Sequence, residues 1–229
     1  MSEFDQHAAT YASAVNDSIA FSGLKVDTFV RAKLHHLERI LRENGVTPAD
    51  RIVDVGCGVG TYERQLAASW PNITGIDVSQ ASINEARTNC PNVAFAQFDG
   101  RTMPFEDDSA AAAFAICVWH HVPVEQWPDF LGEIRRILRP GGVLAVFEHN
   151  PWNPLTRLAV ERCVFDKDAV LLSMPKARRL LASAGLTVEK NQYILTVPAV
   201  TGIAGRIDSW LSPLPTGAQY LVVARKTLQ

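Results

Sequence analysis

The sequence predicts an α/β fold, in which helices cover both faces of a mostly parallel sheet within a single domain. Two observations predict it. Short apolar runs typical of buried strands alternate with longer segments of helical spacing along the 229 residues. Acidic side chains follow three of these strands, and the carboxyl ends of parallel strands form the ligand-binding edge of such sheets.

Composition narrows the class of protein. The sequence has a hydrophobic fraction of 47% and a charged fraction of 20%, which are typical of a globular protein. Its net charge of −2 lacks the basic excess that nucleic-acid binding needs. The four cysteines lack metal-ligand spacing and suit a reducing compartment, so we expect no metal site. The longest apolar run, Ala110–Trp119, is shorter than the ~20 residues of a membrane span, and Met1–Ala8 does not resemble a signal peptide. We therefore expect a cytoplasmic protein that does not bind membranes.

The N-terminal region is expected to be helical. Ser2–Gly23 predicts one or two helices outside the central core, and Lys25–Asn44 predicts a longer helix that ends at Gly45. Lys33 lies at the edge of the apolar stripe of this helix. It either extends its ammonium group to solvent or pairs with a carboxylate of a ligand.

The segment Arg51–Thr61 is central to the prediction. It reads as a buried strand followed by three glycines at alternate positions, and a helix is expected directly after it, over Tyr62–Ala68. Such a turn lets a ligand lie against bare backbone. Asp54 stands near the end of the apolar strand, where a carboxylate would repel a pyrophosphate and attract a cationic amine. The alternative is that Asp54 only caps the turn.

The run D-V-G-C-G-V-G, from Asp54 to Gly60, resembles the first motif of class I S-adenosylmethionine-dependent methyltransferases, in particular their small-molecule, quinone-methyltransferase-like branch. The resemblance covers roughly Leu34–Leu144. It implies a Rossmann-like sheet of seven strands in the order 3-2-1-4-5-7-6, with strand 7 antiparallel and an N-terminal helical lid. It also implies that S-adenosylmethionine is the cofactor and S-adenosylhomocysteine its product.

Two further acids fit this resemblance. Ile73–Val78 reads as the second strand and ends near Asp77, at a spacing where an acid binds ribose hydroxyls. Ser79 should cap the next helix, which runs to about Asn89. Val93–Phe98 is the third strand, and Asp99 after it is implied to contact the adenine amino group; the alternative is an ordinary Asp-Gly turn. The cofactor residues that the resemblance implies are Tyr11, Lys33, Asp54, Gly56, Cys57, Gly58, Gly60, Asp77, Val78, Asp99, Gly100 and Cys117.

The remaining elements complete the sheet. The expected strands are Ala110–Val118, Val143–Phe147, Thr187–Val197 and Gln219–Arg225, with helices over Val124–Leu138 and from Pro175 to Gly185. An Arg-Pro-Gly-Gly turn precedes the fifth strand, and Pro198–Thr216 reads as a loop with a short helix. Within one domain, residues 1–45 would form the lid, 46–150 the cofactor half and 151–229 the substrate half.

Three histidines follow strands that should line the pocket, namely His120, His121 and His149. Methyl transfer to a hydroxyl benefits from a base with a pKa near neutrality, which suits histidine. The stretch W-H-H-V-P resembles one seen in small-molecule members of the family, although these side chains could also only shape the loop. We expect one of the three to orient or deprotonate the acceptor, and we expect a monomer or a homodimer.

Several functions remain open. An O-methyltransferase of a small metabolite is favoured over N- or C-methylation of a metabolite or quinone precursor. A non-catalytic subunit that binds S-adenosylmethionine is a further alternative. A nicotinamide-dependent oxidoreductase would need the G-x-G-x-x-G spacing and an apolar residue at position 54. An RNA methyltransferase is disfavoured by the acidic balance.

Overall fold

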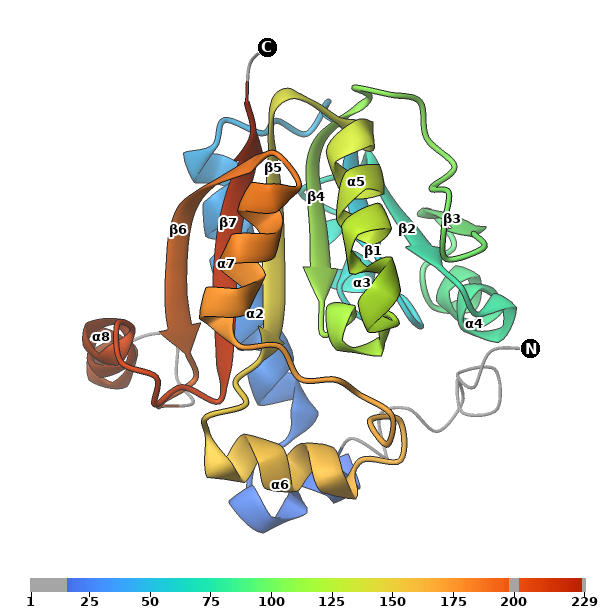
Figure 1. The fold of residues 1–229 in the computed structure, drawn as a ribbon. Coiled ribbons are helices and arrows are strands. Elements are labelled where there is room, and N and C mark those ends of the chain that lie inside the picture. The colour runs from blue at the N-terminus through green and yellow to red at the C-terminus, as the bar shows by residue number, and fades with distance from the viewer. Residues whose placement is uncertain (1–15, 198–201, 228–229) are drawn as a thin grey trace.

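A seven-stranded sheet forms the centre of the computed structural model, which describes residues 16–197 and 202–227. Its strand order, β3-β2-β1-β4-β5-β7-β6, confirms the predicted order (Figure 1). Strands β1 to β5 pair in parallel, and β7 runs antiparallel to both of its neighbours. The strands are β1 Ile52–Val55, β2 Ile73–Asp77, β3 Ala94–Gln97, β4 Ala110–Ile116, β5 Leu138–His149, β6 Leu186–Ile194 and β7 Gln219–Lys226.

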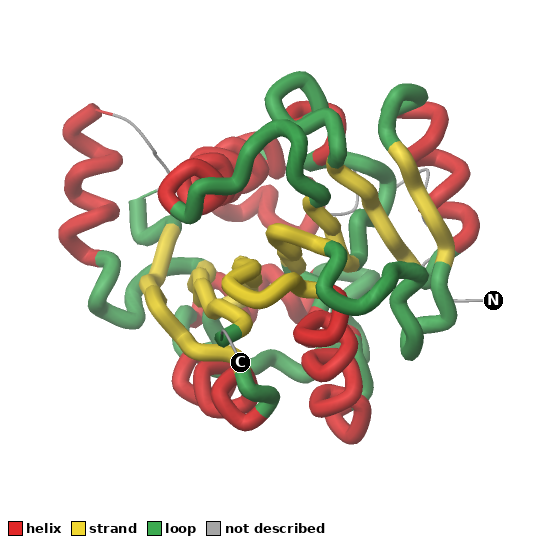
Figure 2. Tube along the Cα trace, turned by 90° about the horizontal axis from the view of Figure 1, so that it is seen from above, coloured by secondary structure: helices red, strands yellow, loops and turns green. Residues whose placement is uncertain are grey.

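Helices cover both faces of this sheet. In Figure 1, α5 and α7 lie in front of it and α2 lies behind, and Figure 2 shows the same layers from above. Helix α4 packs beside β2 and β3, while α6 lies beneath the sheet and α8 lies beside β6. The helices are α2 Val26–Glu43, α3 Glu63–Leu66, α4 Gln80–Asn89, α5 Trp127–Ile137, α6 Pro154–Arg162, α7 Met174–Ser183 and α8 Gly202–Leu211, with 3₁₀ turns η3 Ala20–Ser22, η4 Trp119–His121 and η5 Val124–Gln126.

The core divides into two layers because successive side chains of a strand point to opposite faces. Along β5, Leu144 and Val146 pack with α5 and α7, whereas Val143, Ala145 and Phe147 pack with α2. Both layers are closed to solvent, which holds the ends of the central strands in fixed positions. Among the described residues, no helix has the length and apolar character that crossing a bilayer requires.

The strand order reverses between β1 and β4, and this is where ligands bind in open α/β sheets. The turns that follow these two strands touch each other. A Cβ added to Gly56 would lie 2.4 Å from Cγ2 of Val118, and Gly56 has a φ of +82°. Glycine is therefore required at position 56 for two reasons, the positive φ of the backbone and the close approach of Val118.

Some elements differ from the sequence prediction. The Arg-Pro-Gly-Gly turn lies inside β5, because Ala110 pairs with Leu138 while Ala112 pairs with Val143, so the chain loops out between them. The helix expected over Tyr62–Ala68 shortens to Glu63–Leu66. A helix that the sequence analysis did not identify, α6, follows β5 and is capped by Asn153, whose side chain accepts from the amides of Leu155 and Thr156. Ser79 caps α4 as predicted.

Candidate active site

Two buried carboxylates lie beneath the glycine turn. Asp54 is the penultimate residue of β1 and is 1% exposed, and Glu63, the first residue of α3, is fully buried. Glu63 lies over β2, since a Cβ on Gly75 would come within 2.7 Å of its Oε1, and Gly75 is the register partner of Asp54. In the described parts of the chain, neither carboxylate has a donor that bonds to it.

Burial and neighbouring charges raise the pKa of both groups. Burial, followed by the charge of Glu63, raises the pKa of Asp54 well above its ordinary value. Burial also raises the pKa of Glu63, to about 7. The charge of Asp77 contributes to both increases. The three carboxylates therefore form a site of negative potential that a cation would relieve.

Asp77 holds the glycine turn to the end of β2. Its Oδ2 accepts from the Gly58 amide at 2.9 Å, and its Oδ1 accepts from the Ser79 amide at 2.8 Å. A Cβ at Gly58 would meet no atom within 4 Å, so the backbone there borders open space. Among the other predicted residues of this region, Cys57 and Gly60 are buried and Val78 is exposed.

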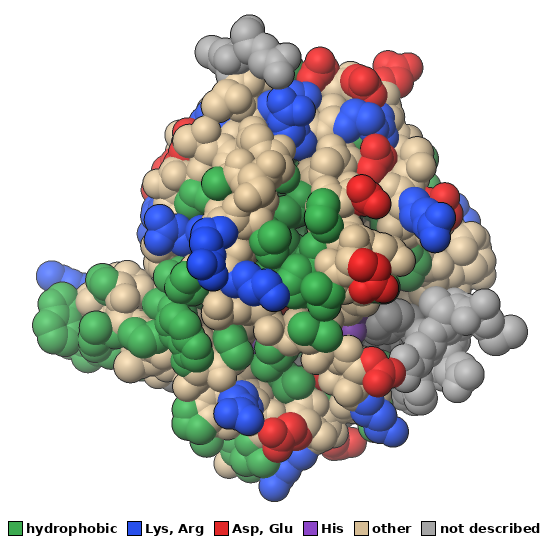
Figure 3. Space-filling model, in the orientation of Figure 1, with side chains coloured by type: hydrophobic (Ala, Val, Ile, Leu, Met, Phe, Trp, Pro, Cys, Tyr) green, Lys and Arg blue, Asp and Glu red, His purple; other side chains and the backbone are tan. Residues whose placement is uncertain are grey.

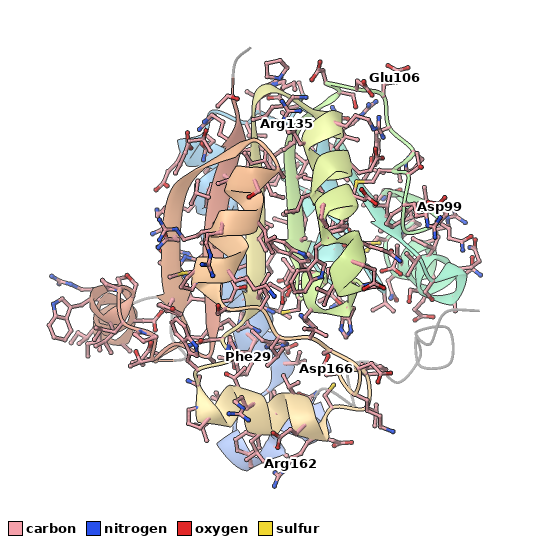
Figure 4. The ribbon with its side chains drawn as sticks, viewed as in Figure 1. Phe29, Asp99, Glu106, Arg135, Arg162 and Asp166 are labelled. Carbon is pink, nitrogen blue, oxygen red and sulfur yellow. The ribbon has the colours of Figure 1, made fainter. Side chains whose placement is uncertain are left out.

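Asp99 follows β3 and is exposed, whereas Asp54 is buried. Its Oδ1 accepts from the amides of Arg101 and Thr102, both at 2.8 Å, and these backbone hydrogen bonds lower its pKa. This is the turn that the sequence analysis gave as the alternative. In Figure 4, Asp99 lies on the β3 side of the molecule, far from Asp166 below the sheet. A surface depression of about 600 Å³ runs from Gly100 to α5 and includes none of the central acids or histidines.

A thiol and a lysine meet at the end of β4. Lys33 is only 6% exposed, so it does not extend to solvent, and its Nζ lies 3.6 Å from Sγ of Cys117. Gln219 Nε2 is 3.5 Å from the same sulfur. Burial disfavours the thiolate, but the charges of Lys33 and His149 outweigh it and lower the pKa of Cys117 to about 7. Cys117 also has a φ of +57°, which is uncommon for a residue with a side chain.

The three predicted histidines come together below β4 and β5. The ring centroid of His120 lies 4.1 Å from that of His121 and 5.1 Å from that of His149. Glu148 Oε2 is 2.5 Å from Nδ1 of His120, while its Oε1 accepts from the amides of Val118 and Trp119. Asp166 completes the cluster from the opposite side, 3.3 Å from Nε2 of His121.

The carboxylates set the charge of this cluster. Burial works against protonation of His120, yet the charge of Glu148 and hydrogen bonding raise its pKa to about 10. Burial lowers the pKa of His121. Burial would raise the pKa of Asp166, but hydrogen bonds with His120 and His121 hold it well below the ordinary range.

Sequence reasoning missed two residues of this site. Glu63 could have been identified as an acid at an inward position just after the glycine turn. Asp166 carried no such signal, since it belongs to the segment between α6 and α7. Tyr11, which was predicted to contact the cofactor, lies outside the described residues.

Comparisons with known proteins show which domain model and which relatives this chain resembles. Residues 52–142 match the model of a methyltransferase domain. A sterol 24-C-methyltransferase of Gibberella zeae is 31% identical over 129 residues, which is 53% of this chain and 33% of the relative. The chain spans about a third of the length of the curated relatives it matches first.

Solved structures match over nearly the whole chain. The partner of the Trm112 methyltransferase activator in a complex from Haloferax volcanii has a TM-score of 0.70 at 23% identity, covering 100% of this chain and 99% of that one. A SAM-dependent methyltransferase from Thermotoga maritima has a TM-score of 0.69 at 19% identity, covering 98% of both chains. At these identities the likeness concerns the fold.

Proposed function

This chain has the class I S-adenosylmethionine-dependent methyltransferase fold and carries a methyltransferase domain, and from that premise we propose that it methylates a small-molecule acceptor. The observation that carries the proposal is the group of three carboxylates, Asp54, Glu63 and Asp77, around a turn of positive-φ glycines. A dinucleotide would bring two negative phosphates to this position, and the carboxylates would repel them.

The residues present fit S-adenosylmethionine, which carries a sulfonium and an ammonium group. Buried carboxylates without donors would gain a cationic partner, and Gly58 leaves space where a Cβ would otherwise intrude. Asp77 would bind the ribose hydroxyls after releasing its hold on the Gly58 amide. Lys33 would pair with the carboxylate of the ligand from the buried face of α2.

When bound, the cofactor supplies a methyl group already activated by its positive sulfur. The chain therefore has to align the acceptor, exclude water and accept a proton. We assign acceptor contact to His121 and His149, which are partly exposed, whereas His120 is 1% exposed and is held by Glu148. His120 acts as a positioning residue for the cluster.

Oxygen is the acceptor atom that we favour, because imidazole groups suit the removal of a proton from a hydroxyl. Carbon is the second candidate, and one observation favours it: the relative from Gibberella zeae is named as a sterol 24-C-methyltransferase. Exposed apolar side chains also surround the Asp166 segment and α6, namely Trp152, Leu155, Val164 and Val170. Figure 3 shows apolar side chains on this lower face of the molecule. An apolar acceptor would suit either atom.

Two measurements test the proposal. Calorimetric titration with S-adenosylmethionine should give one site per chain, with affinity lowered at least tenfold in Asp54→Asn and unchanged in the exposed control Asp168→Asn. Incubation with methyl-labelled cofactor and pooled metabolites, followed by mass spectrometry and NMR of the labelled product, then identifies the methylated atom. Binding without any label transfer would favour the non-catalytic subunit, and absence of binding would overturn the proposal.

A further inference from the structure

Three metal-ligating atoms converge at the end of β4, outside the group of acids assigned to the cofactor. Nε2 of His120, Nε2 of His121 and Oδ1 of Asp166 all lie within 4.8 Å of one another. We propose that these three residues bind a divalent transition-metal ion, for which Zn²⁺ is the probe. The sequence, in which no cluster of acids and histidines has ligand spacing, predicts no metal site, and this proposal departs from that expectation.

The separations of Asp166 Oδ1 from the two imidazole nitrogens are long for hydrogen bonds and also suit a shared ion. Asp166 Oδ1 lies 3.5 Å from Nε2 of His120 and 3.3 Å from Nε2 of His121. An ordinary N–H···O bond measures about 2.9 Å between heavy atoms. Two ligands each about 2.1 Å from a tetrahedral zinc ion are about 3.4 Å apart, which falls between the two observed values.

Nε2 of His120 is buried and points into this cluster. It is an unpartnered atom on a side chain that is 1% exposed, as judged over residues 16–197 and 202–227. The opposite ring nitrogen, Nδ1, faces Glu148 Oε2 at 2.5 Å. Metal binding displaces the proton on Nε2, while the proton on Nδ1 stays with Glu148, which is the carboxylate–histidine arrangement that orients metal ligands.

Backbone contacts hold the ligands in place. The amides of Val118 and Trp119 donate to Glu148 Oε1, at 3.1 and 2.7 Å. The Val170 amide donates to the carbonyl of His120 at 2.9 Å, which attaches the Asp166 segment to η4. The side chains of His121 and Asp166 are 21% and 11% exposed, so an ion can enter from the solvent side.

The donor set indicates the class of ion. Two imidazole nitrogens and one carboxylate oxygen favour zinc and related transition metals, whereas magnesium and calcium prefer sites made only of oxygen. Three protein ligands also leave a coordination position open for a small molecule. If the proposed function holds, that position would take the acceptor hydroxyl and lower its pKa. His121 would then act on the acceptor through the ion, and the released proton would pass to His149.

Metal binding can be measured without any activity. The full chain is treated with a chelator, dialysed and titrated with Zn²⁺ against a chromogenic competitor, with thermal unfolding followed in parallel. We expect one Zn²⁺ per chain and a melting temperature that rises with zinc concentration. Affinity should fall at least 100-fold in Asp166→Asn and His121→Ala, and 10- to 100-fold in Glu148→Gln, which retains the ligands. Asp168→Asn and His35→Ala are the matched controls and should bind as the wild type does.

Each outcome decides the point. Fewer than about 0.1 Zn²⁺ per chain, or equal binding by wild type and Asp166→Asn, would overturn the metal site; circular dichroism spectra establish that the variants are folded. Titration of the chelated protein with S-adenosylmethionine separates this proposal from the proposed function. Cofactor binding without zinc binding removes only the metal site, and zinc binding without cofactor binding removes only the methyltransferase proposal.

Discussion

Replacing Glu63 by glutamine tests the electrostatics of the buried acidic pair. The glutamine amide has nearly the same shape as the carboxyl group and carries no charge at any pH. Burial raises the pKa of Glu63 from 4.5 to about 7. Between these two pKa values, the folded state keeps a proton on Glu63 that the unfolded chain has released. The stability associated with the protonated Glu63 is therefore fully present below pH 4.5 and is lost as pH rises through 7.

The size of the effect follows from the shift. One pKa unit corresponds to about 1.4 kcal/mol, so the change from 4.5 to about 7 amounts to about 3 kcal/mol. Glu63→Gln should therefore match the wild type near pH 5 and be more stable by up to about 3 kcal/mol at pH 8.5. Urea unfolding between pH 5 and 8.5, followed by circular dichroism, measures this difference.

The exposed control Glu125→Gln should change stability little, and equally, at every pH. The reasoning would be refuted if the stability of Glu63→Gln paralleled that of the wild type from pH 5 to 8.5. It would also be refuted if the variant were the less stable protein at high pH. Either result would mean that Glu63 ionises in the folded state as it does in water.

Three further predictions concern the cofactor side. Asp77→Ala should lower the affinity for S-adenosylmethionine about 30-fold, or roughly 2 kcal/mol, the scale of lost charge-assisted hydrogen bonds; unchanged calorimetric affinity would contradict the ribose assignment. Gly56→Ala should lower the melting temperature markedly, because its Cβ meets Val118 at 2.4 Å. The Cβ of Gly58→Ala meets no atom within 4 Å, so this variant costs about 1 kcal/mol of backbone strain and mainly weakens cofactor binding. A Gly56→Ala variant that melts like the wild type would be inconsistent with this packing. The rate of carbamidomethylation of Cys117 by iodoacetamide should be half-maximal near pH 7, as its lowered pKa implies, whereas burial raises the pKa of Cys57, Cys90 and Cys163 and slows their reaction. Peptide mass spectrometry over pH 6–9 measures the rates at all four thiols. A midpoint above pH 8.5 for Cys117 would contradict the lysine–thiol contact.

The positions of Asp54, Asp77 and the glycine turn could be predicted from the sequence because they depend on local patterns. An acid at the end of an apolar strand, followed by glycines, places Asp54 and the turn almost without reference to the rest of the chain. Asp77 follows from the same logic one strand later. The contact of Asp99 with the adenine amino group stays a prediction, and in the structure its carboxylate accepts from two amides of its own turn.

The acceptor side depends on contacts between distant parts of the chain. Asp166 reaches the histidines only because α6 turns the chain back beneath the sheet, and α6 was not predicted. Lys33 shows the same difficulty in a helix: its spacing is equally consistent with a solvent-facing ammonium, and only tertiary packing buries it beside Cys117. Local periodicity carries no information about either contact.

The path of the Asp166 segment has a consequence for how acceptor preference could be altered. The segment follows residue 142, where the match to the methyltransferase domain ends, and one backbone hydrogen bond, from Val170 to His120, joins it to the turn that carries the histidines. Natural variation or grafting could therefore replace this stretch as a unit and change the acceptor, while the cofactor half keeps its sequence.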